Sequence, residues 1–347
     1  MKRRALAFFG FLLFPVWALG QPPRVIPLPE LEEPSGVRAE HGRVYIQDKN
    51  DIAVFSFDTG RFMRRIGRRG QGPGEYAMLG GFTVLEDRLA VVDIAKMLFF
   101  SLEGEYLGQL DVRRRSYYYP YLPVGKHFVG VPLEVRDDGT IARQAGVIYD
   151  PSGTPVRRFV EVPDVLPPPP PPPPKPGSSR SSGTEDVLMV RDYFDYVVSG
   201  DRIFVADSTK GLSVSVFDES GAPLYEIRPP SERVKVSGEY RDFARKSRPE
   251  QYWTNHKPVF PEYFPAMAAF KIDGGRIYII TPAKSGGRHE VIVTDLGGKV
   301  LDRGFRCPVP IDFWVPQSFA RTFDIEAGRF VWVAYNDATE IYELHID

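Results

Sequence analysis

One short pattern recurs along the chain, as GRVYIQD (residues 42–48), DRLAVVD (87–93), DRIFVAD (201–207), GRIYII (275–280) and GRFVWV (328–333). Each copy begins with glycine or aspartate followed by arginine, and continues as a run of β-branched, aromatic and other apolar residues. Such a run directly after a turn residue is typical of a β-strand. A weaker sixth copy lies near residues 126–133. The recurrence predicts a series of similar small sheets.

The copies begin near residues 42, 87, 126, 201, 275 and 328. Each is followed by a second strand-like run, a turn such as that between Asp218 and Gly221, and, in all but the last copy, a third run. A four-stranded blade of a β-propeller takes about 40 to 50 residues. Three of the spacings fit one blade, and the two longest leave room for an insertion.

The segment before each copy supplies a fourth, innermost strand, at residues 36–40, 80–85, 121–125, 193–198, 268–272 and 322–325. The last copy lacks its outer strand, whereas residues 24–28 form a spare strand near the start. A strand donated to the last blade would close the ring and cover its open edge. We therefore expect residues 21–347 to form a single all-β, six-bladed β-propeller, with a proline-rich loop at about 163–186 and a helical cap at 228–261.

The first twenty residues have the features of a secretory signal peptide. Lys2, Arg3 and Arg4 precede an apolar run, and Ala18 and Gly20 form a small-x-small cleavage pattern. A periplasmic or secreted protein without a membrane span after signal removal is expected. The alternative is an N-terminal membrane anchor, although the apolar run is shorter than the roughly 20 residues that a spanning helix needs.

Charge and cysteine content narrow the function classes. Removal of the three basic residues near the start changes the formal net charge from −1 to −4, which does not indicate a nucleic-acid-binding surface. The single cysteine, Cys307, cannot form an internal disulfide. We expect it to be a buried, inert thiol, the alternative being a reactive or intermolecular one.

Two segments carry a family resemblance. The sequences RRGQGPGEY (residues 68–76) and FPEYFPA (260–266) resemble segments of bacterial six-bladed propellers related to the NHL-repeat group. The resemblance implies a propeller fold and an exported protein, since most members of that group are exported proteins of unassigned activity. Some relatives in the wider superfamily are lyases or metal-dependent lactonases, but no positions of this chain match their catalytic residues.

The links between blades are basic and rich in aromatic residues, a combination typical of binding hot spots. Residues 228–261 alone hold eight basic and four acidic residues. We expect these links to hold an anionic or carbohydrate ligand or another envelope protein, the alternative being a solvated charged rim. The candidate ligand-binding residues are Arg68, Arg69, Glu75, Arg114, Tyr118, Trp253, His256 and Trp314.

Aspartates recur at the end of the second strand, at Asp48, Asp93 and Asp207. A ring of such carboxylates could bind a divalent cation such as calcium, whereas the alternative is a repeated turn cap. We expect no other cofactor. The histidines lack metal-ligand spacing, and no phosphate-binding loop or nucleophile elbow is present.

These observations favour a non-enzymatic binding module, and whether the protein is an enzyme stays open. One alternative is a metal-dependent lyase or lactonase with its site at the channel mouth, and another is a structural subunit of an envelope assembly. The eight prolines at 167–174 predict a polyproline II spacer or a recognition peptide for another protein.

Overall fold

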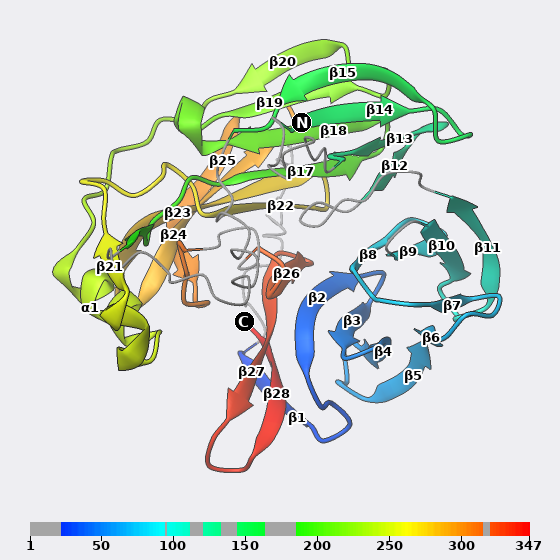
Figure 1. The fold of residues 1–347 in the computed structure, drawn as a ribbon, viewed down its shortest axis with the longest axis horizontal. Coiled ribbons are helices and arrows are strands. Elements are labelled where there is room, and N and C mark those ends of the chain that lie inside the picture. The colour runs from blue at the N-terminus through cyan, green and yellow to red at the C-terminus, as the bar shows by residue number, and fades with distance from the viewer. Residues whose placement is uncertain (1–21, 94–95, 112–120, 133–143, 164–184, 315–319) are drawn as a thin grey trace, which may run out of the picture.

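The computed structural model describes residues 22–93, 96–111, 121–132, 144–163, 185–314 and 320–347. In this part of the chain, six four-stranded antiparallel sheets are arranged as the blades of a ring (Figure 1). The six-bladed propeller predicted from the repeat is confirmed. The expected signal peptide and nearly all of the proline-rich loop lie outside the described residues.

The first three blades follow one another along the chain, and each runs from its innermost to its outermost strand. Blade 1 comprises β2 (Pro34–Glu40), β3 (Arg43–Asp48), β4 (Asp51–Ser56) and β5 (Phe62–Ile66). Blade 2 comprises β8 (Gly81–Val84), β9 (Arg88–Val92), β10 (Lys96–Ser101) and β11 (Tyr106–Asp111). Blade 3 comprises β12 (Leu122–Val124), β13 (His127–Gly130), β14 (Ala145–Tyr149) and β15 (Pro155–Glu161).

Blades 4 and 5 repeat this order. Blade 4 comprises β17 (Phe194–Ser199), β18 (Arg202–Asp207), β19 (Val214–Asp218) and β20 (Pro223–Ile227). Blade 5 comprises β22 (Ala269–Asp273), β23 (Arg276–Ser285), β24 (Arg288–Asp295) and β25 (Val300–Cys307).

Blade 6 joins the two ends of the described chain. Its inner strands are β26 (Phe323–Glu326), β27 (Arg329–Asn336) and β28 (Ile341–Ile346), and its outer strand is β1 (Arg24–Leu28). Strand β1 pairs with β28 over its whole length, from Arg24 opposite Ile346 to Leu28 opposite Tyr342. Figure 1 shows β1 beside the red C-terminal strands. The predicted closure of the ring by an N-terminal strand is confirmed.

Apolar side chains pack between neighbouring blades, because both faces of each blade are covered by the next sheet. Phe55 of blade 1 and Leu344 of blade 6 belong to one buried cluster, together with Leu28 of β1. A second cluster joins Val54 of blade 1 to Val91 of blade 2. Among the described strands, no sheet combines strands of two different blades, so packing of these apolar side chains is a main contact between neighbouring blades.

The predicted Asp-x-x-Gly turns form between the two outermost strands of several blades. In blades 3, 4 and 5, the Oδ1 atom of Asp150, Asp218 or Asp295 accepts backbone N–H groups two and four residues further on, at 2.8–3.0 Å. The glycine three residues after each aspartate has a positive φ, as Gly221 does at 75°. This conformation costs glycine little, which explains the turn sequence.

The long link between blades 4 and 5, residues 228–261, is called the cap below. It contains α1 (Gly238–Lys246), the 3₁₀ helix η2 (Glu250–Thr254) and β21 (His256–Val259). Ser237 caps α1, because its Oγ accepts the Tyr240 N–H at 3.1 Å. Strand β21 pairs in parallel with β16 (Glu185–Leu188), which precedes blade 4. Among the described residues, no helix has the length and apolar character that crossing a membrane requires.

Candidate functional site

The glycine-rich link between blades 1 and 2 forms a closed turn. Strand β6 (Arg68–Arg69) pairs in parallel with β7 (Glu75–Tyr76). Glu75 accepts the Gly72 N–H at 2.8 Å and the Arg68 Nε–H at 2.7 Å, and these two donors hold the pKa of Glu75 below its usual range. The side chains of Arg68 and Glu75 thus bond to one another across the link. Both Arg68 and Arg69 are exposed.

The recurring aspartates bind backbone N–H groups, and those of blades 1 and 2 hold the link that leads into their own blade. Asp48 accepts the N–H groups of Glu32 and Glu33 at 2.9 and 2.6 Å, and Asp93 accepts those of residues 77 and 78 at 3.1 Å. Asp207 instead caps the short 3₁₀ helix η1 (Ser208–Lys210). Each carboxylate also has a basic partner, such as Arg65 at 2.9 Å from Asp48. Each of these aspartates therefore acts as an acceptor that caps backbone N–H groups.

No group of three or more histidine, cysteine, aspartate or glutamate side chains is placed to hold a metal ion in the described part of the chain. The three aspartates belong to blades 1, 2 and 4, and the backbone amides and cations that they contact are separate in each blade. Cys307 is buried, and burial raises the pKa of its thiol to about 12. The thiol is thus protonated at neutral pH.

Three of the candidate aromatic residues lie in or against the cap. His256 stacks on Tyr252, with ring centroids 4.1 Å apart, and Trp253 donates its Nε1–H to the Arg245 carbonyl at 3.0 Å. The Arg248 guanidinium lies over the ring of Trp314, which belongs to the link after blade 5, with 3.8 Å between the guanidinium carbon and the ring centroid. The structure therefore brings Trp253, His256 and Trp314 to the cap.

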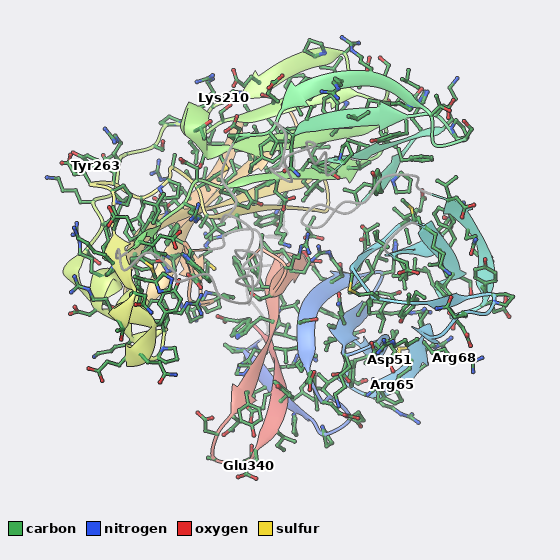
Figure 2. The ribbon with its side chains drawn as sticks, in the orientation of Figure 1. Asp51, Arg65, Arg68, Lys210, Tyr263 and Glu340 are labelled. Carbon is green, nitrogen blue, oxygen red and sulfur yellow. The ribbon has the colours of Figure 1, made fainter. Side chains whose placement is uncertain are left out.

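The glycine-rich link and the cap are on different sides of the ring. Figure 2 shows Arg68 beside blade 1 on the right and Tyr263, just after the cap, on the left. Arg68, Arg69 and Glu75 therefore do not share one site with the cap aromatics. Arg114 and Tyr118 lie outside the described residues.

The cap surface carries several pairs of arginine and aromatic side chains. Besides Arg248 over Trp314, the Arg233 guanidinium lies 3.7 Å from the Tyr263 ring centroid, and that of Arg241 lies 5.3 Å from the Phe260 centroid. Stacking of this kind holds a guanidinium in place while its N–H groups stay available for an anion.

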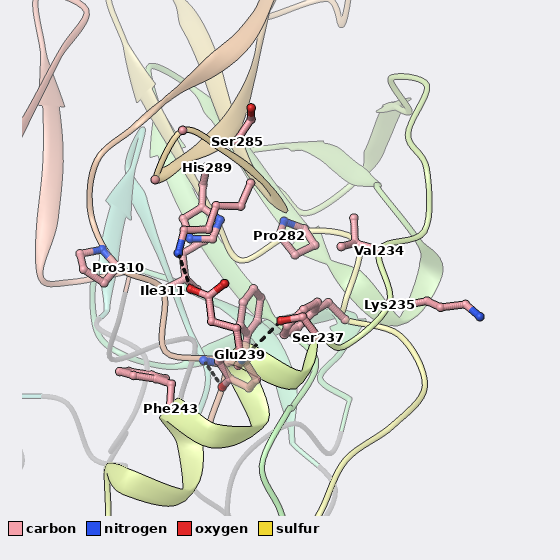
Figure 3. A pocket seen from close by; sticks show the side chains of 16 residues that line it. Val234, Lys235, Ser237, Glu239, Phe243, Pro282, Ser285, His289, Pro310 and Ile311 are labelled. Atoms are coloured by element: carbon pink, nitrogen blue, oxygen red, sulfur yellow. Dashed lines mark hydrogen bonds and ion pairs between the residues drawn. The ribbon is translucent and has the colours of Figure 1, made fainter.

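A pocket of about 610 Å³ lies between α1, the hairpin that joins β23 to β24, and the link after β25. Figure 3 shows its lining, which includes Phe243 of α1 and His289 of β24. The volume falls in the range of small-molecule sites, which is about 300–1,000 Å³. No motif in the sequence indicates this pocket, because its lining comes from distant segments.

Charged side chains of the innermost strands form a second feature that the sequence analysis missed. Lys271 of β22 donates to the Ala320 carbonyl at 2.6 Å and lies 3.6 Å from Asp324 of β26, and burial lowers the pKa of Lys271 to about 8. Asp324 also accepts the Ala39 N–H at 3.0 Å. These contacts link blades 5, 6 and 1.

A cluster of four carboxylates lies near the ends of the innermost strands β2, β22 and β26, and consists of Glu40, Asp273, Asp324 and Glu326. Burial and the nearby carboxylates of Asp273, Asp324 and Glu326 raise the pKa of Glu40 to about 7, against the opposing effect of His41. Glu326 accepts the Gly42 N–H at 3.0 Å. The hydrogen bond between Gly42 and Glu326 therefore connects blade 1 to blade 6.

Comparison with known proteins agrees with this architecture. A family described as "6-bladed beta-propeller" matches residues 29–121, which span blades 1 and 2. The fold is a six-bladed β-propeller. No curated protein sequence matches the chain.

Solved structures resemble the chain weakly. One is KlHsv2 with loop 6CD replaced by a Gly-Ser linker (8% identity, 91% of this chain and 85% of that chain covered, TM-score 0.34). Another is Hsv2 of Kluyvelomyces marxianus (10% identity, 91% and 86% covered, TM-score 0.36). A third is BBS1N in complex with ARL6DN, soaked with mercury (9% identity, 91% and 78% covered, TM-score 0.38).

Proposed function

We propose that this protein is an exported, non-enzymatic binding module whose cap holds an acidic segment of a protein partner. The observation that carries the proposal is the set of arginine–aromatic pairs on the cap, formed by Arg233, Arg241 and Arg248 with neighbouring rings. Export follows from the signal-like first twenty residues, which predict a periplasmic or secreted location.

The charge of the cap supports an anionic partner. The cap contains eight basic and four acidic residues, whereas the whole chain has a formal net charge of −1. A local excess of positive charge attracts and orients acidic partners. Tyrosine, tryptophan and arginine are also the residues that dominate protein interfaces, because they combine area, hydrogen bonds and cation–π contacts.

Helix α1 of the cap is held in place by hydrogen bonds to neighbouring segments. Tyr240 of α1 accepts the Phe313 N–H at 3.1 Å and donates to the Met189 carbonyl at 3.3 Å, so α1 is tied to segments on either side. Ala244 of α1 is buried. A surface that is already ordered loses less entropy when a partner binds.

The test uses a short poly-glutamate peptide as the probe and fluorescence anisotropy as the readout. We expect Arg233→Ala and Arg248→Ala to weaken binding roughly five-fold each, the effect of losing one moderate hot spot. Arg61→Ala is the matched control, since Arg61 is an exposed arginine in the turn before β5, outside the cap. Equal binding by all three variants, or no binding at low ionic strength, contradicts the proposal.

A salt titration separates an acidic partner from a carbohydrate. Binding of an acidic peptide should weaken as ionic strength rises from low to physiological, because the exposed charges are screened. A neutral oligosaccharide that binds the cap with no dependence on salt would instead favour a carbohydrate ligand.

A further inference from the structure

A small pocket, called the inner pocket below, lies between the innermost strands of blades 1 and 2 and the link that leads into blade 6. Figure 1 shows these strands, β2 and β8, on the sides of their blades that face the middle of the ring. The volume of the inner pocket is about 190 Å³, below the roughly 300 Å³ at which sites for drug-sized ligands begin. Arg38 and Arg321 contribute its two charged side chains, and none of the described residues that line it is acidic. This charge favours a small anion.

Arg38 of β2 has no counter-charge of its own. The residue is partly buried, and its guanidinium donates to the carbonyl of the preceding residue, Val37, at 2.8 Å. It forms no ion pair with any carboxylate of the described residues. A guanidinium has five N–H donors, so most of those of Arg38 are left for another partner. An anion that meets a partly desolvated guanidinium forms strong, charge-assisted hydrogen bonds.

Asp195, on the innermost strand β17 of blade 4, is a carboxylate that both arginines influence. Burial raises the pKa of Asp195, against the opposing effect of nearby cations that include Arg321 and Arg38. Its Oδ1 accepts the Tyr196 N–H at 2.8 Å, and its Oδ2 accepts the Tyr193 hydroxyl at 3.2 Å. Asp195 therefore has other donors and is not an ion-pair partner of Arg38.

Asp324 of β26 is also occupied by other groups. It lies 3.6 Å from Lys271, and it accepts the Ala39 N–H at 3.0 Å. Because Lys271 offsets the charge of Asp324, this carboxylate does not compensate Arg38 either. The counter-charge of Arg38 must therefore come from outside the described part of the chain.

We propose that the inner pocket binds a small molecule through one oxyanion group, a carboxylate or a phosphate, held by the guanidinium groups of Arg38 and Arg321. The planar fork of a guanidinium matches both groups, because two parallel N–H donors meet two oxygens. Ser35 adds a hydroxyl to the same lining. The inner pocket involves no residue of the cap, so the proposal does not depend on the acidic partner proposed above.

The test is isothermal titration calorimetry of the intact protein with two probes, inorganic phosphate and succinate. Sodium chloride keeps the ionic strength constant and supplies an anion that cannot accept a bidentate pair of hydrogen bonds. We expect saturable binding of at least one probe with a Kd below about 1 mM. The tighter of the two probes identifies the group, phosphate or carboxylate. Absence of saturable binding of both probes in this range overturns the proposal.

Substitutions of Arg38 test the first guanidinium. Arg38→Gln should weaken the bound probe roughly ten-fold or more, the effect of losing a hydrogen bond to a charged group. Arg38→Lys keeps the charge but not the fork, so its affinity should lie between those of Arg38→Gln and the unchanged protein. Arg61→Gln is the matched control, since it removes one exposed arginine outside the inner pocket. Equal weakening by Arg38→Gln and Arg61→Gln would indicate a general charge effect and contradict the assigned site.

Arg321→Gln tests the second guanidinium from a separate segment, so the proposal stays testable if an Arg38 variant does not fold. This variant should also weaken the probe roughly ten-fold or more, and an unchanged affinity would refute the shared grip. Binding of poly-glutamate to the cap should be unchanged in Arg38→Gln. Failure of this proposal and failure of the proposed function therefore give different results.

Discussion

Replacing Leu28 with alanine tests whether β1 fastens the ring. Leu28 is the last residue of β1, is only 1% exposed, and packs in the cluster shared by blades 1 and 6. Truncation of a fully buried leucine to alanine costs about 2–5 kcal/mol, from lost transfer free energy and the cavity left behind. For a chain of this length, an unfolding entropy of about 2.1 cal/mol/K per residue converts that cost to a fall in Tm of roughly 3–7 °C.

The assay is equilibrium urea unfolding followed by tryptophan fluorescence, with Tm from calorimetry. Val25→Ala is the control in the same strand, because Val25 is 54% exposed and its truncation should change stability by less than about 0.5 kcal/mol. If β1 is an integral part of the ring, Leu28→Ala lowers the midpoint of one cooperative transition. A Leu28→Ala variant as stable as Val25→Ala would refute the reasoning.

Three further predictions concern ionisable side chains. The pKa of His289, lowered to about 4 in the fold, lies below its unfolded value of about 6.5, so the unfolded chain binds the proton first. The unfolding free energy should therefore fall by about 3 kcal/mol as the pH drops from 6.5 to 4, a decrease that urea titrations should find missing in His289→Gln. For Glu40 the stability changes in the opposite direction, because the fold raises its pKa to about 7 and so loses free energy of unfolding as the pH rises from about 4.5 to 7. Glu40→Gln should therefore raise Tm at pH 8 and leave it unchanged at pH 4. Asp48→Ala should cost about 2–4 kcal/mol in urea unfolding, because it leaves two partly buried backbone amides without their acceptor and takes from Arg65 one of its carboxylate partners. An equal loss in Asp218→Ala, which removes the acceptor of a half-buried turn, would contradict this ranking.

The fold could be predicted because its information is local and repeated. Each blade carries its own strand runs and turn residues, so an uncertain copy, such as the one at His127–Gly130, is supported by the others. The sequence has one spare strand, at residues 24–28, and its last copy lacks an outer strand. In the structure the spare strand takes that outer position and pairs with β28. Turn sequences such as Asp218 to Gly221 fixed the ends of strands to within a few residues.

The candidate site was predicted only in part, because its residues come together from distant segments. Phe243, Phe264, His289 and Phe313 belong to α1, two links and a strand, and nothing in their spacing indicates that they line one pocket. His289 was considered only as a metal ligand, since a neutral histidine with an unpaired nitrogen has no sequence signature. The aspartates show the converse difficulty, because a carboxylate after a strand is equally compatible with a turn cap and with a cation site.

The pairing of β1 with β28 also has a consequence for assembly. Strand β1 is synthesised before every blade, whereas its partner follows the other five, so the two can meet only after a very long loop closes. Until then both strands have free edges. Two molecules that meet in this state can exchange their first strands and close each other's rings, so domain-swapped dimers are the misfolded product we expect during refolding at high concentration.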